Sequence, residues 1–208
     1  MKLRNRLKYA ILAGILALAS PSKTTSSDLS FMVLNLNQFT ITAPLEQRLR
    51  RVEGMEAESL ARIVGYDSFI RAASSEYVSP ATLYAMIYQE SRGNPRARSP
   101  KGAEGLLQIT PITQRHLGMK RGEAFDPEIA IAKGTEYYSQ LLDYFHGNEV
   151  LALAAYNYGQ RSTDIILRKK GLNPKTATYE NFGRFLNKET RNYIQDVLAN
   201  REAIKEYL

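Results

Sequence analysis

Apolar residues recur at helical spacing along most of the chain, and this pattern constrains the fold more than any other feature. Leu83, Met86 and Ile87 share one face of a segment that begins at Ser79-Pro80. That pair supplies a capping hydroxyl and a proline at the first helical position. Asp126-Pro127 opens a second, longer segment. The sequence therefore predicts a mainly α-helical, single compact domain.

Further helices are predicted wherever apolar residues fall three and four positions apart. We find no repeat, heptad or strand-rich stretch, so strands are at most a minor element, for example at residues 31–34. The expected helices carry Leu49, Val52, Met55 and Leu60; Phe69, Ile70, Ala73 and Tyr77; Leu83 to Glu90, ended by Gly93-Asn94-Pro95; Ile112 to Leu117; Ile131, Tyr138, Leu141, Leu142 and Phe145; Val150 to Tyr156; and, after a cap at Asn187, Tyr193, Val197 and Leu198.

The first twenty residues have the pattern of a secretory signal peptide. Lys2, Arg4, Arg6 and Lys8 precede a short apolar run that closes on Ala17-Leu18-Ala19, a small-x-small cleavage site. An uncleaved membrane anchor is the alternative, although the run is short for a bilayer span, which needs about 20 residues. We expect a signal peptide at 1–20, a linker or N-terminal extension at 21–44, and one domain at 45–208 with its core at about 65–200. The signal predicts export to the periplasm or cell envelope, and after cleavage no stable membrane span is expected.

Composition excludes several classes of function. The chain has no cysteine, and therefore no disulfide, thiolate metal site or thiol nucleophile. Its two histidines are too few and too far apart to suggest a metal centre, and no cofactor is expected. Four of the 28 basic residues lie in the signal segment, which leaves 24 against 21 acids, a net charge of +3. This mild charge argues against a nucleic-acid binder.

Glu90 is the residue that suggests chemistry. It lies on the apolar face of its predicted helix, seven residues after Leu83. Burial disfavours the ionised carboxylate and raises its pKa, so that it can hold a proton near neutrality. A general acid that protonates a glycosidic oxygen needs this property. The pattern alone fits equally well a glutamate at a frayed helix end that turns to solvent.

Four motifs resolve this ambiguity, because they occur in the order and at the spacing of one family. The chain resembles the soluble lytic transglycosylases, lysozyme-like enzymes that degrade peptidoglycan, over roughly residues 65–200. The motifs are Glu90-Ser91-Arg92-Gly93-Asn94-Pro95 with Gly105-Leu106-Leu107-Gln108; Asp126-Pro127 with Gly134; Ala154-Ala155-Tyr156-Asn157; and Glu189-Thr190-Arg191-Asn192-Tyr193-Ile194.

The resemblance implies a lysozyme-like fold with a substrate groove and assigns roles to matching residues. Glu90 corresponds to the family's catalytic acid, and Tyr193 to a tyrosine whose hydroxyl orients it. Ser99 corresponds to a hydroxyl near the acid and the reacting sugar. Gln108, Tyr156 and Asn157 correspond to groove residues, with the Gln108 amide able both to donate to and to accept from a sugar. Two departures are Leu107, where methionine is usual, and Tyr158, where a small residue is usual.

The resemblance also implies a mechanism with Glu90 as single acid and base. It would cleave the bond between N-acetylmuramic acid and N-acetylglucosamine and form a 1,6-anhydro sugar without consuming water. The sequence leaves open a muramidase on the same fold, and a non-catalytic wall-binding component of a secretion apparatus. It also leaves open whether a secretion or conjugation apparatus is a partner. Neither Glu104 nor Glu189 matches a nucleophile position of the family, and Glu189 is expected to act locally at its helix start.

Overall fold

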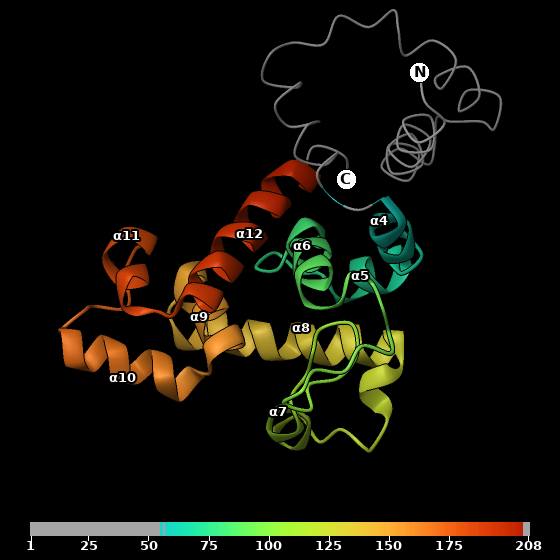
Figure 1. Cartoon of the computed structure of the whole chain (residues 1–208), viewed down its shortest axis with the longest axis horizontal. Helices are drawn as coiled ribbons and strands as arrows, with labels where there is room; N and C mark the ends of the chain where they lie inside the picture. Colours follow the sequence, from blue (N-terminus) through green and yellow to red (C-terminus); the bar gives the residue numbers. More distant parts are fainter. Residues whose placement is uncertain (1–54, 56, 206–208) are drawn as a thin grey trace, which may run out of the picture.

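The computed structural model describes residue 55 and residues 57–205, and in this part of the chain it is built from α-helices and short 3₁₀ turns (Figure 1). The elements, labelled as in Figure 1, are α4 (Ala57–Val64), α5 (Asp67–Ala73), α6 (Pro80–Ser91), α7 (Pro111–His116), η2 (Glu123–Phe125), α8 (Pro127–Tyr144), α9 (Glu149–Tyr158), α10 (Gln160–Lys170), α11 (Tyr179–Phe182), η3 (Gly183–Phe185) and α12 (Lys188–Lys205). The predicted mainly helical fold is confirmed.

Helix α6 lies at the centre of the domain. Every residue from Ala81 to Tyr88 is buried, so this helix is covered by neighbours all round rather than on one face. Helix α12 packs along α6 more extensively than any other pair of described helices pack together (Figure 1). Because α12 comes from the C-terminal part of the chain, the centre of the fold joins two distant segments of sequence.

Helix boundaries follow the predicted caps. The Ser79 side chain accepts a hydrogen bond from the Thr82 backbone N–H at the start of α6, and Asp126 accepts one from Ile129 at the start of α8. Asn187 Oδ1 accepts from the Thr190 backbone N–H at 2.8 Å and caps α12. These caps fix where each helix enters the core.

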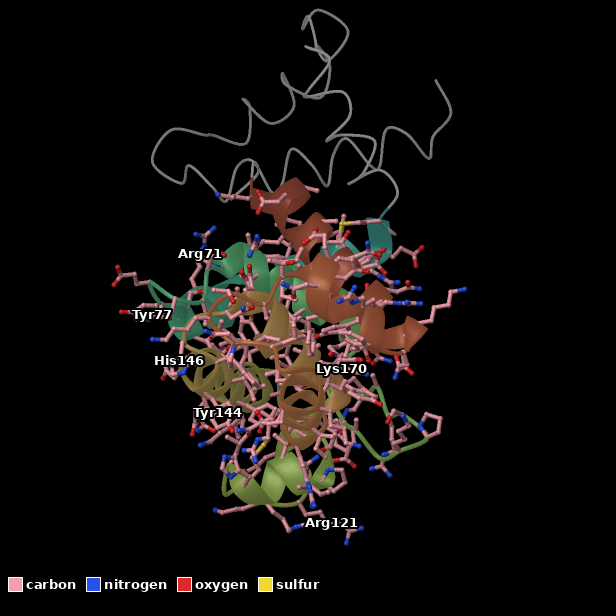
Figure 2. All side chains as sticks on the ribbon, turned by 90° about the vertical axis from the view of Figure 1, so that its left-hand side faces the viewer. Arg71, Tyr77, Arg121, Tyr144, His146 and Lys170 are labelled. Carbon is pink, nitrogen blue, oxygen red and sulfur yellow. The ribbon has the colours of Figure 1, made fainter. Side chains whose placement is uncertain are left out.

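Other predictions of local structure were wrong. Helix α5 ends at Ala73, so Tyr77 lies beyond it in a loop, 79% exposed and directed away from the molecule (Figure 2). The sequence also predicted no helix between Asn157 and Asn187, where the structure has α10 and α11. These two helices lie at the opposite end of the molecule from α4 and α5 (Figure 1).

Extended structure is confined, within the described residues, to isolated bridges in the loop between α6 and α7. Arg98 pairs with Glu104, and Glu104 with Ile109. None of the described helices combines the length and apolar character needed to cross a bilayer. The signal peptide, the linker, the strand at 31–34 and the helix expected before Met55 lie outside the described residues.

Candidate active site

Glu90 occupies the last turn of the central helix α6. The residue keeps limited contact with solvent, but its carboxyl is surrounded by protein. This burial raises the pKa of Glu90 from 4.5 to about 7. The Tyr193 hydroxyl opposes the shift and the negative charge of Glu189 adds to it. Glu90 is thus a carboxyl that can hold and release a proton near neutral pH.

Tyr193 approaches Glu90 from α12. Its side chain is 4% exposed, and burial followed by the charge of Glu90 holds the pKa of its phenol well above the usual range. Its hydroxyl has no partner of ordinary hydrogen-bond geometry among the described residues, yet it lies close enough to lower the pKa of Glu90. The Tyr193 hydroxyl therefore lies close to the Glu90 carboxyl, and its orienting role stays a prediction.

Tyr156, on α9, lies near Glu90 and contacts the loop before α7. Its hydroxyl donates to the Leu107 backbone carbonyl at 2.8 Å, which ties α9 to the loop that precedes α7. Its ring lies 5.5 Å from that of Tyr137 and 6.2 Å, edge to face, from that of Tyr138. Burial and the nearby charge of Glu90 raise the pKa of the Tyr156 phenol. Tyr156 thus lies beside Glu90, but its hydroxyl is occupied by the protein.

Asn157 follows Tyr156 and is half-buried. Its side-chain oxygen accepts a hydrogen bond of 2.8 Å from the hydroxyl of Thr190 on α12. Tyr158, at the end of α9, is 40% exposed. The Asn157 amide is therefore held by a helix far away in sequence, whereas Tyr158 stands at the surface.

The loop between α6 and α7 holds Gln108 and Ser99. The Gln108 side-chain nitrogen donates to the backbone carbonyls of Ala97 at 3.2 Å and Gly105 at 3.0 Å. The expectation that this amide also donates to a sugar is corrected, because both N–H groups are used inside the loop; the side-chain oxygen is the atom that can accept.

Ser99 has the opposite arrangement. Its Oγ accepts from the Ala103 backbone N–H at 3.0 Å, so its hydroxyl proton can be donated to another group. The groups that shift the pKa of Glu90 are Tyr193 and Glu189, and Ser99 is not among them. The structure thus brings Tyr193 and Tyr156 to Glu90, while Ser99 interacts within its own loop.

Two other carboxylates lie near these motifs and behave differently. Glu104 forms an ion pair of 2.7 Å with Arg98 and accepts from Gln114 at 3.1 Å, so it fastens the loop. Glu189 lies in the first turn of α12, where a negative charge is favourable, and is exposed. This position fits the local role expected for Glu189, and its charge also adds to the raised pKa of Glu90.

Two glycines bring backbone segments together around this loop. A Cβ on Gly105 would overlap the Ala124 carbonyl oxygen, and Gly105 has a φ of +77°. A Cβ on Gly134 would overlap the Leu107 side chain, so α8 also packs tightly against the loop. The close approach at Gly105 is therefore to η2.

Sequence reasoning missed Thr190 as a contact of Asn157 and missed the influence of Glu189 on Glu90. Both residues belong to the motif that contains Tyr193, and spacing of three positions places Thr190 and Tyr193 on one side of α12. That spacing was the available signal. The partner on α9 could not be read from it.

Comparison with known proteins relates this chain to lytic transglycosylases. The family described as "Transglycosylase SLT domain" matches residues 67–181, more than half of the chain. The soluble lytic murein transglycosylase of Escherichia coli K12 is 32% identical over 141 residues, covering 64% of this chain and 22% of that protein. The membrane-bound lytic murein transglycosylase F of Vibrio cholerae is 28% identical over 149 residues, covering 60% of this chain and 28% of that protein.

Among solved structures, the 70 kDa soluble lytic transglycosylase of Escherichia coli aligns with a TM-score of 0.64 and 23% identity, over 92% of this chain and 32% of that one. At this identity the likeness establishes the fold. The present chain spans less than a third of the length of each of these proteins. By the extent of the family match, the chain belongs to the transglycosylase SLT domain family.

Proposed function

We propose that this chain is an exported peptidoglycan lytic transglycosylase with Glu90 as its single acid and base. The observation that carries the proposal is the buried carboxyl of Glu90, with its pKa raised to about 7 beside the Tyr193 hydroxyl. Such a carboxyl can donate a proton to a poor leaving group and then recover one. The relatives named as murein transglycosylases supply the substrate, the glycan strand of the bacterial wall.

In the first step, protonated Glu90 donates its proton to the oxygen that bridges N-acetylmuramic acid and N-acetylglucosamine. The bond between that oxygen and the muramyl anomeric carbon breaks, and N-acetylglucosamine leaves with a free hydroxyl. Positive charge develops on the muramyl ring and is supported by its N-acetyl oxygen. Glu90 remains as a carboxylate, which the Tyr193 hydroxyl stabilises by donating to it.

In the second step, the Glu90 carboxylate removes the proton from the muramyl 6-hydroxyl. The oxygen of that hydroxyl forms a bond to the anomeric carbon and closes a 1,6-anhydro ring. The acid is thereby regenerated, and water takes no part in the balance. A pKa near 7 suits both steps, because the same group must be protonated in the first and deprotonated in the second.

Substrate contacts are proposed for the remaining matched residues. Ser99 has a hydroxyl proton to donate, and Gln108 has a side-chain oxygen that can accept. The Tyr156 ring offers an apolar face to a pyranose, since its hydroxyl is bound to Leu107. Asn157 offers its amide nitrogen. These groups lie on α9 and on the loop before α7, so we propose that the groove runs between these two elements.

The decisive experiment compares Glu90→Gln with the native protein on purified peptidoglycan, with mass spectrometry of the released fragments. Glu90→Gln should release none while keeping affinity for wall material. The native products should carry 1,6-anhydro ends, which are lighter than reducing ends by one water. Glu104→Gln is the matched control, because Glu104 pairs with Arg98 within the loop and has no role in the proposed mechanism.

The outcomes separate the alternatives. Cleavage by Glu90→Gln would refute the catalytic assignment. Reducing ends on all native products would identify a muramidase and refute the transglycosylase step while retaining Glu90 as the acid. Wall binding by the native protein without any cleavage would support a non-catalytic component instead.

Export is proposed on the pattern of residues 1–20, and N-terminal sequencing of the protein from the envelope fraction tests it. The chain recovered there should begin near Ser20. Recovery of the uncleaved chain from the cytosol would contradict export. A secretion or conjugation apparatus as partner stays a proposal, to be tested by crosslinking in intact cells.

A further inference from the structure

Thr190 makes a contact that distinguishes it from other buried threonines of the domain. Its side chain is 1% exposed, and its hydroxyl donates to Asn157 Oδ1 at 2.8 Å, which links α12 to α9. The hydroxyls of Thr135 and Thr163, by contrast, donate to carbonyls one turn earlier in the chain, those of Ile131 and Gly159. The Thr190 hydroxyl is thus directed at another element, the one that carries the Tyr156-Asn157 motif.

The position of Thr190 is fixed from its own helix. It is the third residue of α12, and its backbone N–H donates to the capping side chain of Asn187 at 2.8 Å. The carbonyl one turn earlier belongs to Leu186, which lies outside the helix. Tyr193 follows three positions later, on the same side of α12. One side of this helix therefore serves both Glu90, through Tyr193, and Asn157, through Thr190.

The contact determines which end of the Asn157 amide is occupied. If the amide were reversed, the buried Thr190 hydroxyl would lose the acceptor for its proton, and an unsatisfied buried donor is unfavourable. The oxygen is therefore kept toward Thr190 and the nitrogen on the other side of the amide. No partner for that nitrogen is found in the part of the chain that the structure describes, and Asn157 is only half-buried.

We propose that Thr190 is a positioning residue that fixes Asn157 as a hydrogen-bond donor to an acceptor oxygen of the glycan, either a carbonyl or a hydroxyl oxygen. The proposal rests on the function proposed above, but it concerns binding and not proton transfer. Asn157 thus selects for an acceptor at one point of the sugar, because an amide that could rotate freely would receive a donor or an acceptor equally well.

The test measures binding of uncross-linked peptidoglycan glycan strands in a Glu90→Gln background, where strands are not cut. Thr190→Val keeps the volume and removes the hydroxyl, so affinity should fall about tenfold, the equivalent of one hydrogen bond. Thr190→Ser keeps the hydroxyl and should restore affinity. Thr135→Val is the matched control: it removes a buried hydroxyl that bonds only within α8, and it should leave affinity unchanged.

Asn157→Asp tests the donor directly. Aspartate can still accept from Thr190 but has no N–H, so affinity should fall about tenfold or more while the thermal midpoint is retained. In the active enzyme, Thr190→Val should raise KM with little change in kcat or in the pH profile that reports Glu90. A purely structural role would not produce this split together with rescue by serine.

Affinity in Thr190→Val equal to that of Thr135→Val would overturn the positioning role. Tight binding by Asn157→Asp would overturn the donor role. Cleavage activity surviving in Glu90→Gln would refute the catalytic proposal but not the role of Thr190, which the KM of Thr190→Val in the active enzyme still tests. Absence of glycan binding by the parent protein would instead refute the proposed function, and the role of Thr190 with it.

Discussion

Replacing Glu90 by glutamine should stabilise the protein above neutral pH and leave its stability unchanged in acid. The pKa of Glu90 is raised from 4.5 to about 7, chiefly by burial. At about 1.4 kcal/mol for each pH unit, this difference corresponds to about 3 kcal/mol. Glutamine keeps the shape of the side chain and carries no charge at any pH. The whole cost of the buried charge should therefore disappear in the variant.

The direction of the effect follows from proton binding. Below pH 4.5 the carboxyl is protonated in both the folded and the unfolded chain, so it imposes no penalty. Between pH 4.5 and about 7 the unfolded chain releases the proton while the folded chain retains it. Stability therefore decreases as pH rises through this window, and above pH 7 the folded protein bears the full cost of the charge.

Urea unfolding of the native protein and Glu90→Gln at pH 4 and pH 8 measures the effect. The two should have similar free energies of unfolding at pH 4, and the variant should be more stable by about 3 kcal/mol at pH 8, with equal m-values. Glu76→Gln, at an exposed loop position, is the control and should show no such pH dependence. An equal difference at both pH values would refute burial of the carboxyl as the source of its altered pKa.

Three further predictions follow from the same geometry. Tyr193→Phe removes the hydroxyl that lowers the pKa of Glu90. The alkaline limb of the kcat–pH profile should therefore move to higher pH, and kcat should fall about tenfold or more. An unmoved limb would contradict the contact between Tyr193 and Glu90. Glu189→Gln removes a charge that raises the pKa of Glu90, so the alkaline limb should move to lower pH while cleavage continues. Loss of all cleavage would instead indicate a catalytic role for Glu189. Gly105→Ala forces a Cβ onto a backbone carbonyl at positive φ and should cost about 3 kcal/mol or more in thermal unfolding. Gly102→Ala, where a Cβ would make only ordinary van der Waals contact with Pro111, should cost about 1 kcal/mol. Equal losses would refute the close approach at Gly105.

Much of the fold could be predicted from local signals. The caps at Ser79, Asp126 and Asn187 act within one turn of their own helices, so sequence alone locates three helix starts. Helix α10 was missed because only Thr163 and Leu167 of it are buried, which leaves too narrow an apolar stripe to recognise. Tyr77 was misplaced because an apolar residue at helical spacing does not reveal where the preceding helix ends.

The candidate site, too, could be predicted only in part. The apolar residues around Glu90 on its helix fitted a buried and an exposed carboxyl equally well, so the family resemblance was needed both for its burial and for its partner Tyr193. The internal bonds of Gln108 and the contact between Thr190 and Asn157 depend on how separate elements meet. Such contacts leave no periodic pattern in a single sequence, so they become visible only when the backbone is known.

The packing of α12 against α6 also has a consequence for how the protein matures. Glu90 lies on a helix made early in synthesis, whereas Tyr193 and Thr190 arrive with one of the last elements described. Until α12 docks, the Glu90 carboxyl is incompletely covered and should behave as an ordinary, ionised glutamate. The protonated acid thus becomes available only when the domain is assembled. The raised pKa of Glu90 is therefore a property of the folded domain, and a partly folded chain should lack the acid needed for cleavage.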